Sequence, residues 1–147
     1  MSPDRQPQHR YPDDELFDSL FDQEATGIAV TTLAGRFLRV NRALCRMIGY
    51  SAEELLQKTF QDITHPDDLE SNENFRQRLL SGDAANQTLD KRYIRKDGKL
   101  ISVRIVVTVV RDSTGSPQCC TTLVHDMTAN LQAQDASRES EDRKSVV

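Results

Sequence analysis

The chain has 147 residues and a formal net charge of −4, and this length is typical of one domain. Hydrophobic residues make up 37% and charged residues 29%, as in a soluble globular chain. The basic residues are dispersed, which argues against a nucleic-acid partner. No apolar run approaches the roughly 20 residues of a membrane-spanning helix, so we expect a cytoplasmic domain without membrane contact. Three cysteines, an odd and sparse set, favour reduced thiols over a disulfide framework.

The first 24 residues divide into two parts. Residues 1–12 combine prolines with polar and charged residues, a composition that buries too little apolar surface to fold, and we expect a disordered arm. Residues 13–24 predict an amphipathic helix, because an aspartate can cap its start and apolar residues recur at helical spacing. The apolar stripe, which needs a partner surface, consists of Leu16, Phe17, Leu20 and Phe21.

Residues 25–40 carry the pattern of a β-hairpin. Residues 28–32 and 36–40 are rich in strand-forming side chains, and Ala34 with Gly35 lies between them. Two such runs separated by a glycine-containing turn favour two antiparallel strands.

Three helix starts follow the hairpin. Asn41 can cap a short helix that ends at Gly49, and Ser51 with Glu54 forms a capping box. Residues 64–68 place a proline and two acidic residues in the first turn of a third helix, a favourable composition there. This helix is expected to extend from about residue 68 to residue 80 and to bury Leu69, Phe75 and Leu79.

Three more strands complete the predicted fold. Residues 87–95 and 100–111 flank Asp97 and Gly98, a strong hairpin signal, and residues 119–127 form the last strand. This order of elements predicts an α+β fold in which a five-stranded antiparallel sheet carries helices packed on one face. The core face of the central run is a β-branched row made of Ile101, Val103, Ile105, Val107 and Val109.

Residues 25–128 resemble the PAS family through four motifs in the right order. Residues 41–55 are similar to its helical centre, with Asn, Gly-Tyr and Ser-x-Glu-Glu-Leu. Residues 65–68, His-Pro-Asp-Asp, resemble the next helix start. Residues 96–98, Lys-Asp-Gly, resemble its later hairpin, and residues 126–128, Asp-Met-Thr, resemble its closing segment. Each motif is weak alone, but together they imply a PAS domain preceded by an amphipathic helix.

The resemblance implies a regulatory domain rather than an enzyme. Such a domain detects a small ligand or a partner and relays the change to a covalently linked output domain or a further PAS domain. The parent protein would be a bacterial sensor histidine kinase or diguanylate cyclase, and residues 129–147 resemble the signalling helix or linker that leads onward. In the relay, Asp126 can pair with Lys96 or Lys99, and Thr128 can cap the following helix.

The outer face of the predicted sheet also has apolar positions, at Val106, Val110 and Leu123. Such a face needs a cover, and the stripe of residues 13–24 is the available one. The helix would lie on this face of its own chain or of a second chain, and we therefore expect a homodimer.

Polar side chains are also expected on the inner face, at Lys91, Tyr93 and Thr122. They could line a ligand pocket opposite the helices. The alternative is a filled core in which Lys91 reaches the edge, and this alternative is favoured because most other inward residues are bulky and apolar. The candidate pocket residues are Cys45, Phe60, Phe75, Lys91, Tyr93, Cys120 and Thr122.

Haem and flavin are not expected as cofactors. Residues 68–82 contain no histidine that could bind haem iron, and residues 60–64 lack the cysteine motif of the flavin-binding light-oxygen-voltage relatives. No metal site or catalytic motif is apparent, although an unidentified small ligand is compatible with the sequence. Two other functions stay open: a structural PAS dimerisation module without a ligand, and a small-molecule-binding or enzymatic α+β domain.

Overall fold

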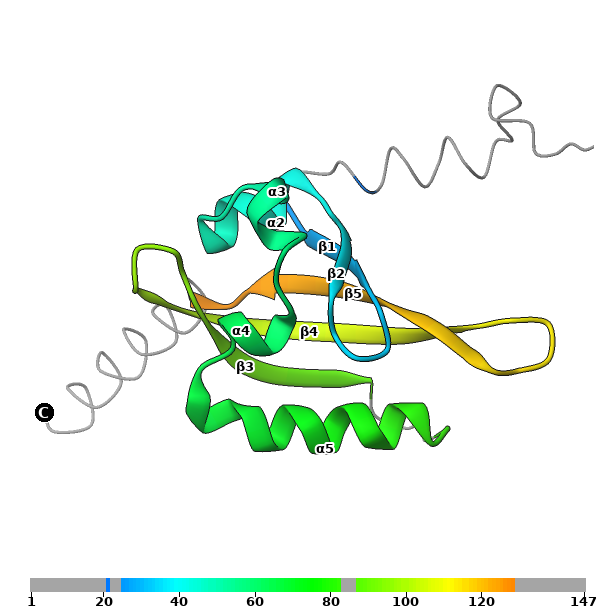
Figure 1. Ribbon diagram of the computed structural model, residues 1–147. Coiled ribbons are helices and arrows are strands. Elements are labelled where there is room, and N and C mark those ends of the chain that lie inside the picture. Colours follow the sequence, from blue (N-terminus) through cyan, green and yellow to red (C-terminus); the bar gives the residue numbers. More distant parts are fainter. Residues whose placement is uncertain (1–20, 22–24, 83–86, 129–147) are drawn as a thin grey trace, which may run out of the picture.

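The structure, a computed structural model, describes residue 21, residues 25–82 and residues 87–128. These residues form one antiparallel sheet with helices packed against it (Figure 1). The expectations for residues 1–12 and 129–147, and for the helix of residues 13–24 apart from Phe21, lie outside the described residues.

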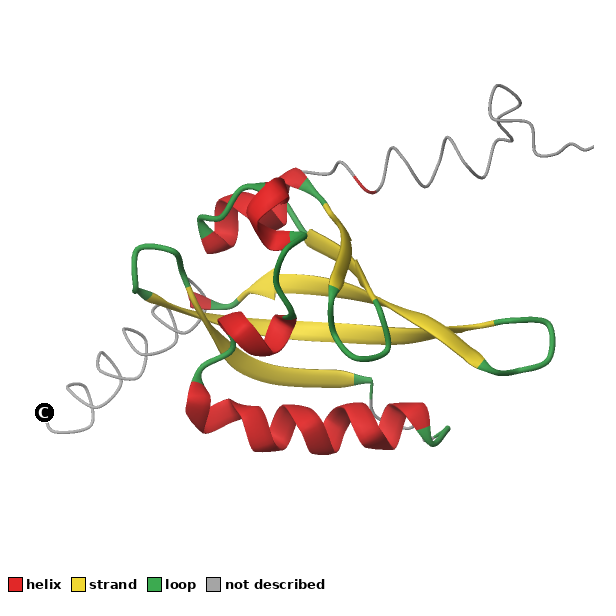
Figure 2. Ribbon diagram, in the orientation of Figure 1, coloured by secondary structure: helices red, strands yellow, loops and turns green. Residues whose placement is uncertain are grey.

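The observed elements follow the predicted order of two strands, helices and three strands, and Figure 2 shows the helices in red and the strands in yellow. The strands are β1 (Gly27–Thr31), β2 (Phe37–Val40), β3 (Thr88–Ile94), β4 (Leu100–Arg111) and β5 (Pro117–Asp126). The helices are α2 (Arg42–Ile48), α3 (Ala52–Leu55), α4 (Phe60–Ile63), the 3₁₀ turn η1 (Pro66–Asp68) and α5 (Leu69–Leu80).

The sheet has the strand order β2-β1-β5-β4-β3, and every neighbouring pair is antiparallel. The last strand in the chain, β5, therefore lies in the middle of the sheet and pairs with both β1 and β4. The end of β5 at Asp126 lies opposite Val103 of β4. β5 therefore joins the two halves of the sheet through backbone pairing.

The predicted caps of α2 and α3 are present. Asn41 accepts a hydrogen bond from the backbone N–H of Leu44 at 3.0 Å, and Gly49 ends α2 with a φ of 86°, in the left-handed region that glycine tolerates. Ser51 and Glu54 exchange the two bonds of a capping box. Asn41 also accepts from the N–H of Ile28 at 2.9 Å, which ties α2 to β1.

The short helix α4 was not predicted, although its signal is in the sequence. Thr59 and Asp62 form a second capping box, in which each side chain bonds the backbone N–H of the other. This box places Phe60 at the first position of α4, next to the sheet. His65 then caps η1 by accepting from the N–H of Asp67 at 3.0 Å.

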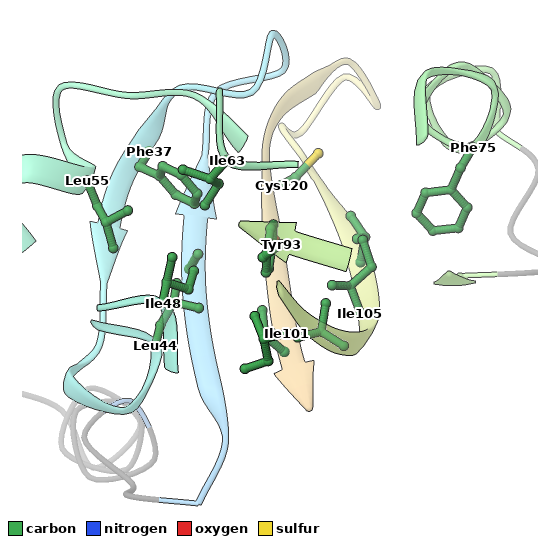
Figure 3. Packing of buried hydrophobic residues seen from close by; sticks show 14 of the residues in the cluster. Phe37, Leu44, Ile48, Leu55, Ile63, Phe75, Tyr93, Ile101, Ile105 and Cys120 are labelled. Atoms are coloured by element: carbon green, nitrogen blue, oxygen red, sulfur yellow. The ribbon is translucent and has the colours of Figure 1, made fainter. Parts of the chain in front are cut away.

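The helices cover one face of the sheet and bury a single core. Figure 3 shows Leu44 and Ile48 together on α2 and Phe75 apart from them on α5, so the core extends across the sheet. The β-branched row of β4 lies in this core as predicted, with Val109 only partly buried. Its fully buried members are Ile101, Val103, Ile105 and Val107.

The expectation that α5 buries Leu69 is wrong. Leu69 is the first residue of α5 and is 36% exposed. The buried face of α5 instead passes through Asn72, Phe75 and Leu79. A polar residue occupies this face because the amide oxygen of Asn72 accepts a hydrogen bond from the buried amine of Lys91.

Candidate functional site

A small cavity lies between the inner face of the sheet and helices α4 and α5. Its volume is about 40 Å³, room for a few water molecules, so the core is largely filled. Six of the seven candidate pocket residues line it: Phe60, Phe75, Lys91, Tyr93, Cys120 and Thr122. The seventh, Cys45, does not line it, because α2 places this half-buried thiol against another part of the core.

Lys91 lies at the polar end of this cavity. The residue is 5% exposed, and its Nζ donates to Thr64 Oγ1 at 3.1 Å and to Asn72 Oδ1. The same nitrogen lies 4.7 Å from the ring centroids of both Phe60 and Tyr93, within the range of cation–π attraction. The amine thus points into the core and does not reach the edge of the sheet.

Burial governs the ionisation of the two polar residues on this part of β3. Desolvation lowers the pKa of Lys91 to about 7, although the charge of Asp68 acts in the opposite direction. Desolvation also raises the pKa of the Tyr93 hydroxyl above its ordinary value. A buried group favours its neutral form, and Lys91 therefore changes charge near neutral pH.

The cysteines have the environments of buried thiols. Burial raises the pKa of both Cys45 and Cys120, which opposes formation of reactive thiolates. Cys120 lines the cavity and is buried, whereas its neighbour Cys119 is only half-buried. None of the three cysteines, all of which lie in the described part of the chain, forms a disulfide.

Three residues of the site were missed in the sequence: Thr64, Asn72 and Arg76. Arg76 on α5 lines the cavity and donates to the backbone oxygen of Leu33 at 2.9 Å, which ties α5 to the β1–β2 connection. Its guanidinium also pairs with Glu73, with 2.6 Å between Nη2 and Oε2. The helical spacing of residues 72, 75 and 79 was the signal that could have identified Asn72.

The closing segment after β5 is hydrogen-bonded back to β4. The N–H of Met127 donates to the oxygen of Ser102 at 2.8 Å, and the N–H of Ser102 donates to Thr128 Oγ1 at 3.2 Å. Asp126 Oδ1 accepts from the N–H of Thr128 at 2.9 Å. Thr128 therefore fastens the segment to β4, and the helix that it was expected to cap lies outside the described residues.

The expected pairing of Asp126 with Lys96 is wrong. Lys96 Nζ instead lies 2.6 Å from Glu54 Oε2 of α3, and its N–H donates to the oxygen of Ile48 at 2.9 Å. Arg95 adds bonds from its guanidinium to α2 carbonyls, including that of Met47. The β3–β4 hairpin is held against the C-terminal end of α2, where cations and donors are favourable, and this position keeps Lys96 from Asp126.

The outer face of the sheet carries the predicted apolar residues. Val110 and Leu123 are 38% and 37% exposed, and Val106 pairs with Leu123 across β4 and β5. Phe21 is buried, and the Arg39 guanidinium lies 4.0 Å from its ring centroid. Leu16, Phe17 and Leu20 lie outside the described residues. Phe21 is therefore the one residue of the predicted apolar stripe whose surroundings the structure describes.

The described part of the chain contains neither a cluster of metal-binding side chains nor a helix that could span a membrane. No three or more His, Cys, Asp or Glu side chains come close enough there to hold a metal ion. None of its helices combines the length and apolar character needed to cross a membrane.

Comparison with known proteins identifies the family. The family model described as "PAS fold" matches residues 37–124, more than half of the chain, and the chain therefore belongs to the PAS family. A PAS domain structure from Colwellia psychrerythraea superimposes with a TM-score of 0.68 at 20% identity, covering 78% of this chain and 97% of that one. The five-stranded antiparallel sheet with its helices is the fold of that domain.

The curated relatives are signalling proteins. The chain is 29% identical over 127 residues to the probable diguanylate cyclase DgcE of Escherichia coli, covering 86% of the chain and 12% of the relative. It is 26% identical over 117 residues to the sensor histidine kinase TmoS of Ectopseudomonas mendocina, covering 80% of the chain and 12% of the relative. The chain thus spans about an eighth of the length of these relatives, and is a PAS domain of the kind found in signal-transduction proteins.

Proposed function

We propose that this PAS domain detects a small molecule in the cavity beneath α4 and α5 and relays its presence through β4 and β5 to residues 126–128. Ligand binding between helices and sheet changes the packing of Lys91 and its neighbours. Because β5 lies in the middle of the sheet and ends in the hydrogen-bonded closing segment, a shift of the sheet alters that segment. In this proposal the domain binds its ligand and does not convert it.

One observation carries this proposal: the cavity and the closing segment share cross-strand rows. Lys91 lies opposite Val103, and Val103 lies opposite Asp126. In the adjacent row, Arg92 lies opposite Ser102, which bonds both Met127 and Thr128. Side chains directly opposite each other in an antiparallel sheet are in contact range, so one residue, Val103, separates Lys91 of the cavity from Asp126.

The parent protein is proposed to be a longer cytoplasmic signalling protein. The two relatives above have eight or so times the length of the matched region, and they are a cyclase and a kinase by name. An output domain of either class, or a further PAS domain, would then receive the change from residues 129–147. We expect no haem or flavin, because the residues that bind them in relatives are missing from the sequence.

Native mass spectrometry of the purified chain, with an absorption spectrum of the same sample, tests the ligand. The proposal predicts a small mass retained on the folded protein and lost on denaturation, with no visible absorption band. A coloured cofactor would contradict the expectation about haem and flavin. A chain that stays bare after exposure to a cell extract of small metabolites would contradict the sensing role.

A second candidate is a dimerisation module that needs no ligand. The outer sheet face favours it, because Val106 and Leu123 lie directly opposite each other there, Leu123 and Val110 are exposed, and an exposed apolar patch often contacts a partner. In this case the core serves only to stabilise the fold, and the domain responds to contact with a second chain.

A further inference from the structure

Lys91 is a buried amine whose hydrogen-bonding partners are all neutral. Its two bonds go to the Thr64 hydroxyl and the Asn72 amide oxygen, and an ammonium group has three N–H donors. The rings of Phe60 and Tyr93 lie on its other sides. No carboxylate forms an ion pair with this nitrogen among the described residues, so its charge has no direct counter-ion.

The lining of the cavity also has more positive than negative side chains. Among the residues that the structure describes, the charged ones that line the cavity are Lys91 and Arg76, and no Asp or Glu lines it. Glu73 already pairs with Arg76. The nearest acidic influence on Lys91 is Asp68, but the carboxylate of Asp68 bonds the guanidinium and N–H of Arg92.

Keeping the Lys91 ammonium group charged in this buried site costs free energy unless an anion lies beside it. Buried charges in proteins are normally paired, and desolvation lowers the pKa of Lys91 although the charge of Asp68 acts in the opposite direction. A ligand carboxylate at Nζ would supply the counter-ion and accept charge-assisted hydrogen bonds. Most of the other lining residues are apolar, and they suit a hydrocarbon body: Ala29, Leu33, Phe37, Phe75, Leu79 and Val107.

We propose that the cavity binds a short-chain aliphatic carboxylate, with its carboxylate on Lys91 Nζ and its hydrocarbon chain directed toward Phe75 and Leu79. This assignment rests on the proposed ligand-sensing function and gives it a chemical class. The small free volume of about 40 Å³ restricts the ligand to a few carbon atoms unless the side chains move. Lys91 then binds as an ammonium group, and the complex is neutral at the binding site.

The test uses butyrate and its neutral isostere butyramide on the 15N-labelled full chain. Amide shifts of Cys120 and Thr122, together with the side-chain amide of Asn72, report binding in the cavity. We expect butyrate to bind about tenfold more tightly than butyramide, as for a charge-assisted bond in place of a neutral one. Lys91→Met is expected to reduce butyrate binding to the butyramide level, whereas Lys99→Met, at an exposed lysine, leaves it unchanged.

A second readout avoids dependence on any variant. The Lys91 side-chain shift is followed against pH with and without butyrate, and the midpoint is expected to move to higher pH as the carboxylate favours the charged amine. The two titrations use the same protein, so the charged and titratable groups around Lys91 are the same in both: Asp68, Arg76, Arg92 and Tyr93. A change in the Lys91 midpoint therefore reports the bound butyrate.

The outcomes separate this inference from the broader proposal. Equal affinity for butyrate and butyramide at the cavity would overturn the carboxylate assignment and leave the ligand-sensing function intact. Shifts confined to surface lysines, or no shifts with either compound, would also overturn it. In that case a different molecule recovered from a metabolite extract would still support sensing, whereas recovery of none would contradict both.

Discussion

Lys91 on β3 and Asp126 on β5 lie opposite the same residue of β4, Val103. Lys91 is the buried amine of the cavity, and Asp126 begins the segment that leaves the sheet. Val103, between them, is 1% exposed and is held on both sides by backbone pairing. This row connects the interior of the domain to the end of β5.

The first prediction concerns the pH dependence of stability. The pKa of Lys91 is about 7 in the folded domain and near its ordinary 10.5 in the unfolded chain. Between these values the unfolded chain binds more protons, so the wild type gains stability relative to Lys91→Met as pH rises. We expect the wild-type minus variant difference in the free energy of unfolding to increase by on the order of 3 kcal/mol between pH 7 and pH 9.5, measured by urea denaturation.

Lys99→Met is the control for this experiment, since it removes an exposed lysine. Its difference from the wild type is expected to stay nearly constant over the same pH range. A constant difference for Lys91→Met as well would show that the amine is not desolvated in the folded protein.

The second prediction concerns Asp68, whose charge raises the pKa of Lys91. Asp68→Asn is expected to move the Lys91 titration midpoint to lower pH, followed by NMR of the side chain. The matched control is Asp90→Asn, because Asp90 also pairs with an arginine, Arg104 at 2.7 Å, but on an exposed part of β3. An identical movement of the midpoint in both variants would mean that the effect is general and not due to Asp68.

The third prediction concerns Gly35 in the β1–β2 turn, beside the cavity residue Phe60. Its φ is 109°, and an added Cβ would lie 2.6 Å from Phe60 Cε2 and 2.5 Å from Gln61 Oε1. Gly115 has a similar φ of 87° but open space around it. Both Gly→Ala changes carry the backbone penalty of about 1–2 kcal/mol, and we expect Gly35→Ala to lose about 1–3 kcal/mol more through overpacking.

Urea midpoints of the two alanine variants measure this difference directly. Equal destabilisation would show that Phe60 and Gln61 move aside without loss, and hence that the wall of the cavity at α4 is compliant.

The fourth prediction concerns the bond between Thr128 and Ser102. Thr128→Val removes the acceptor of the Ser102 N–H, and an intramolecular hydrogen bond contributes about 0.5–1.5 kcal/mol. Amide hydrogen exchange at Ser102 is therefore expected to accelerate in Thr128→Val and to stay near wild type in Thr128→Ser. Unchanged exchange in the valine variant would contradict the attachment of the closing segment to β4.

The fifth prediction tests the outer face as a contact between chains. Leu123→Lys is expected to shift a dimer toward monomer in analytical ultracentrifugation, because it places a charge in an apolar contact. Leu69→Lys is the control: Leu69 has nearly the same exposure, 36% against 37%, but belongs to α5. A dimer that survives Leu123→Lys unchanged would exclude this part of the face from the contact.

The sequence predicted the elements that local chemistry specifies. The caps at Asn41 and Ser51 depend on residues three positions apart, and β4 shows alternating buried and more exposed side chains. Each of these elements could therefore be predicted from neighbouring residues in the sequence. Thr59 and Asp62 carry the same local signal for α4. The family followed from motif order over residues 25–128.

The relationships across the fold could not be predicted in the same way. Lys96 was expected near Asp126, but the hairpin docks on α2, and a contact between distant elements has no local signature. Asn72 was not predicted to be buried, since an asparagine in a helix normally faces solvent. Its partner Lys91, nearly 20 positions away, reverses that preference through one hydrogen bond.

Ligand sensing and its relay are tested together by an NMR comparison of the 15N-labelled chain before and after addition of a low-molecular-mass bacterial metabolite extract. If the domain senses a ligand and relays its presence, the cavity residues Cys120 and Thr122 and the closing-segment residues Met127 and Thr128 are expected to shift together. Shifts limited to the cavity, with Met127 and Thr128 unchanged, would contradict the relay, and a spectrum unchanged throughout would contradict ligand sensing.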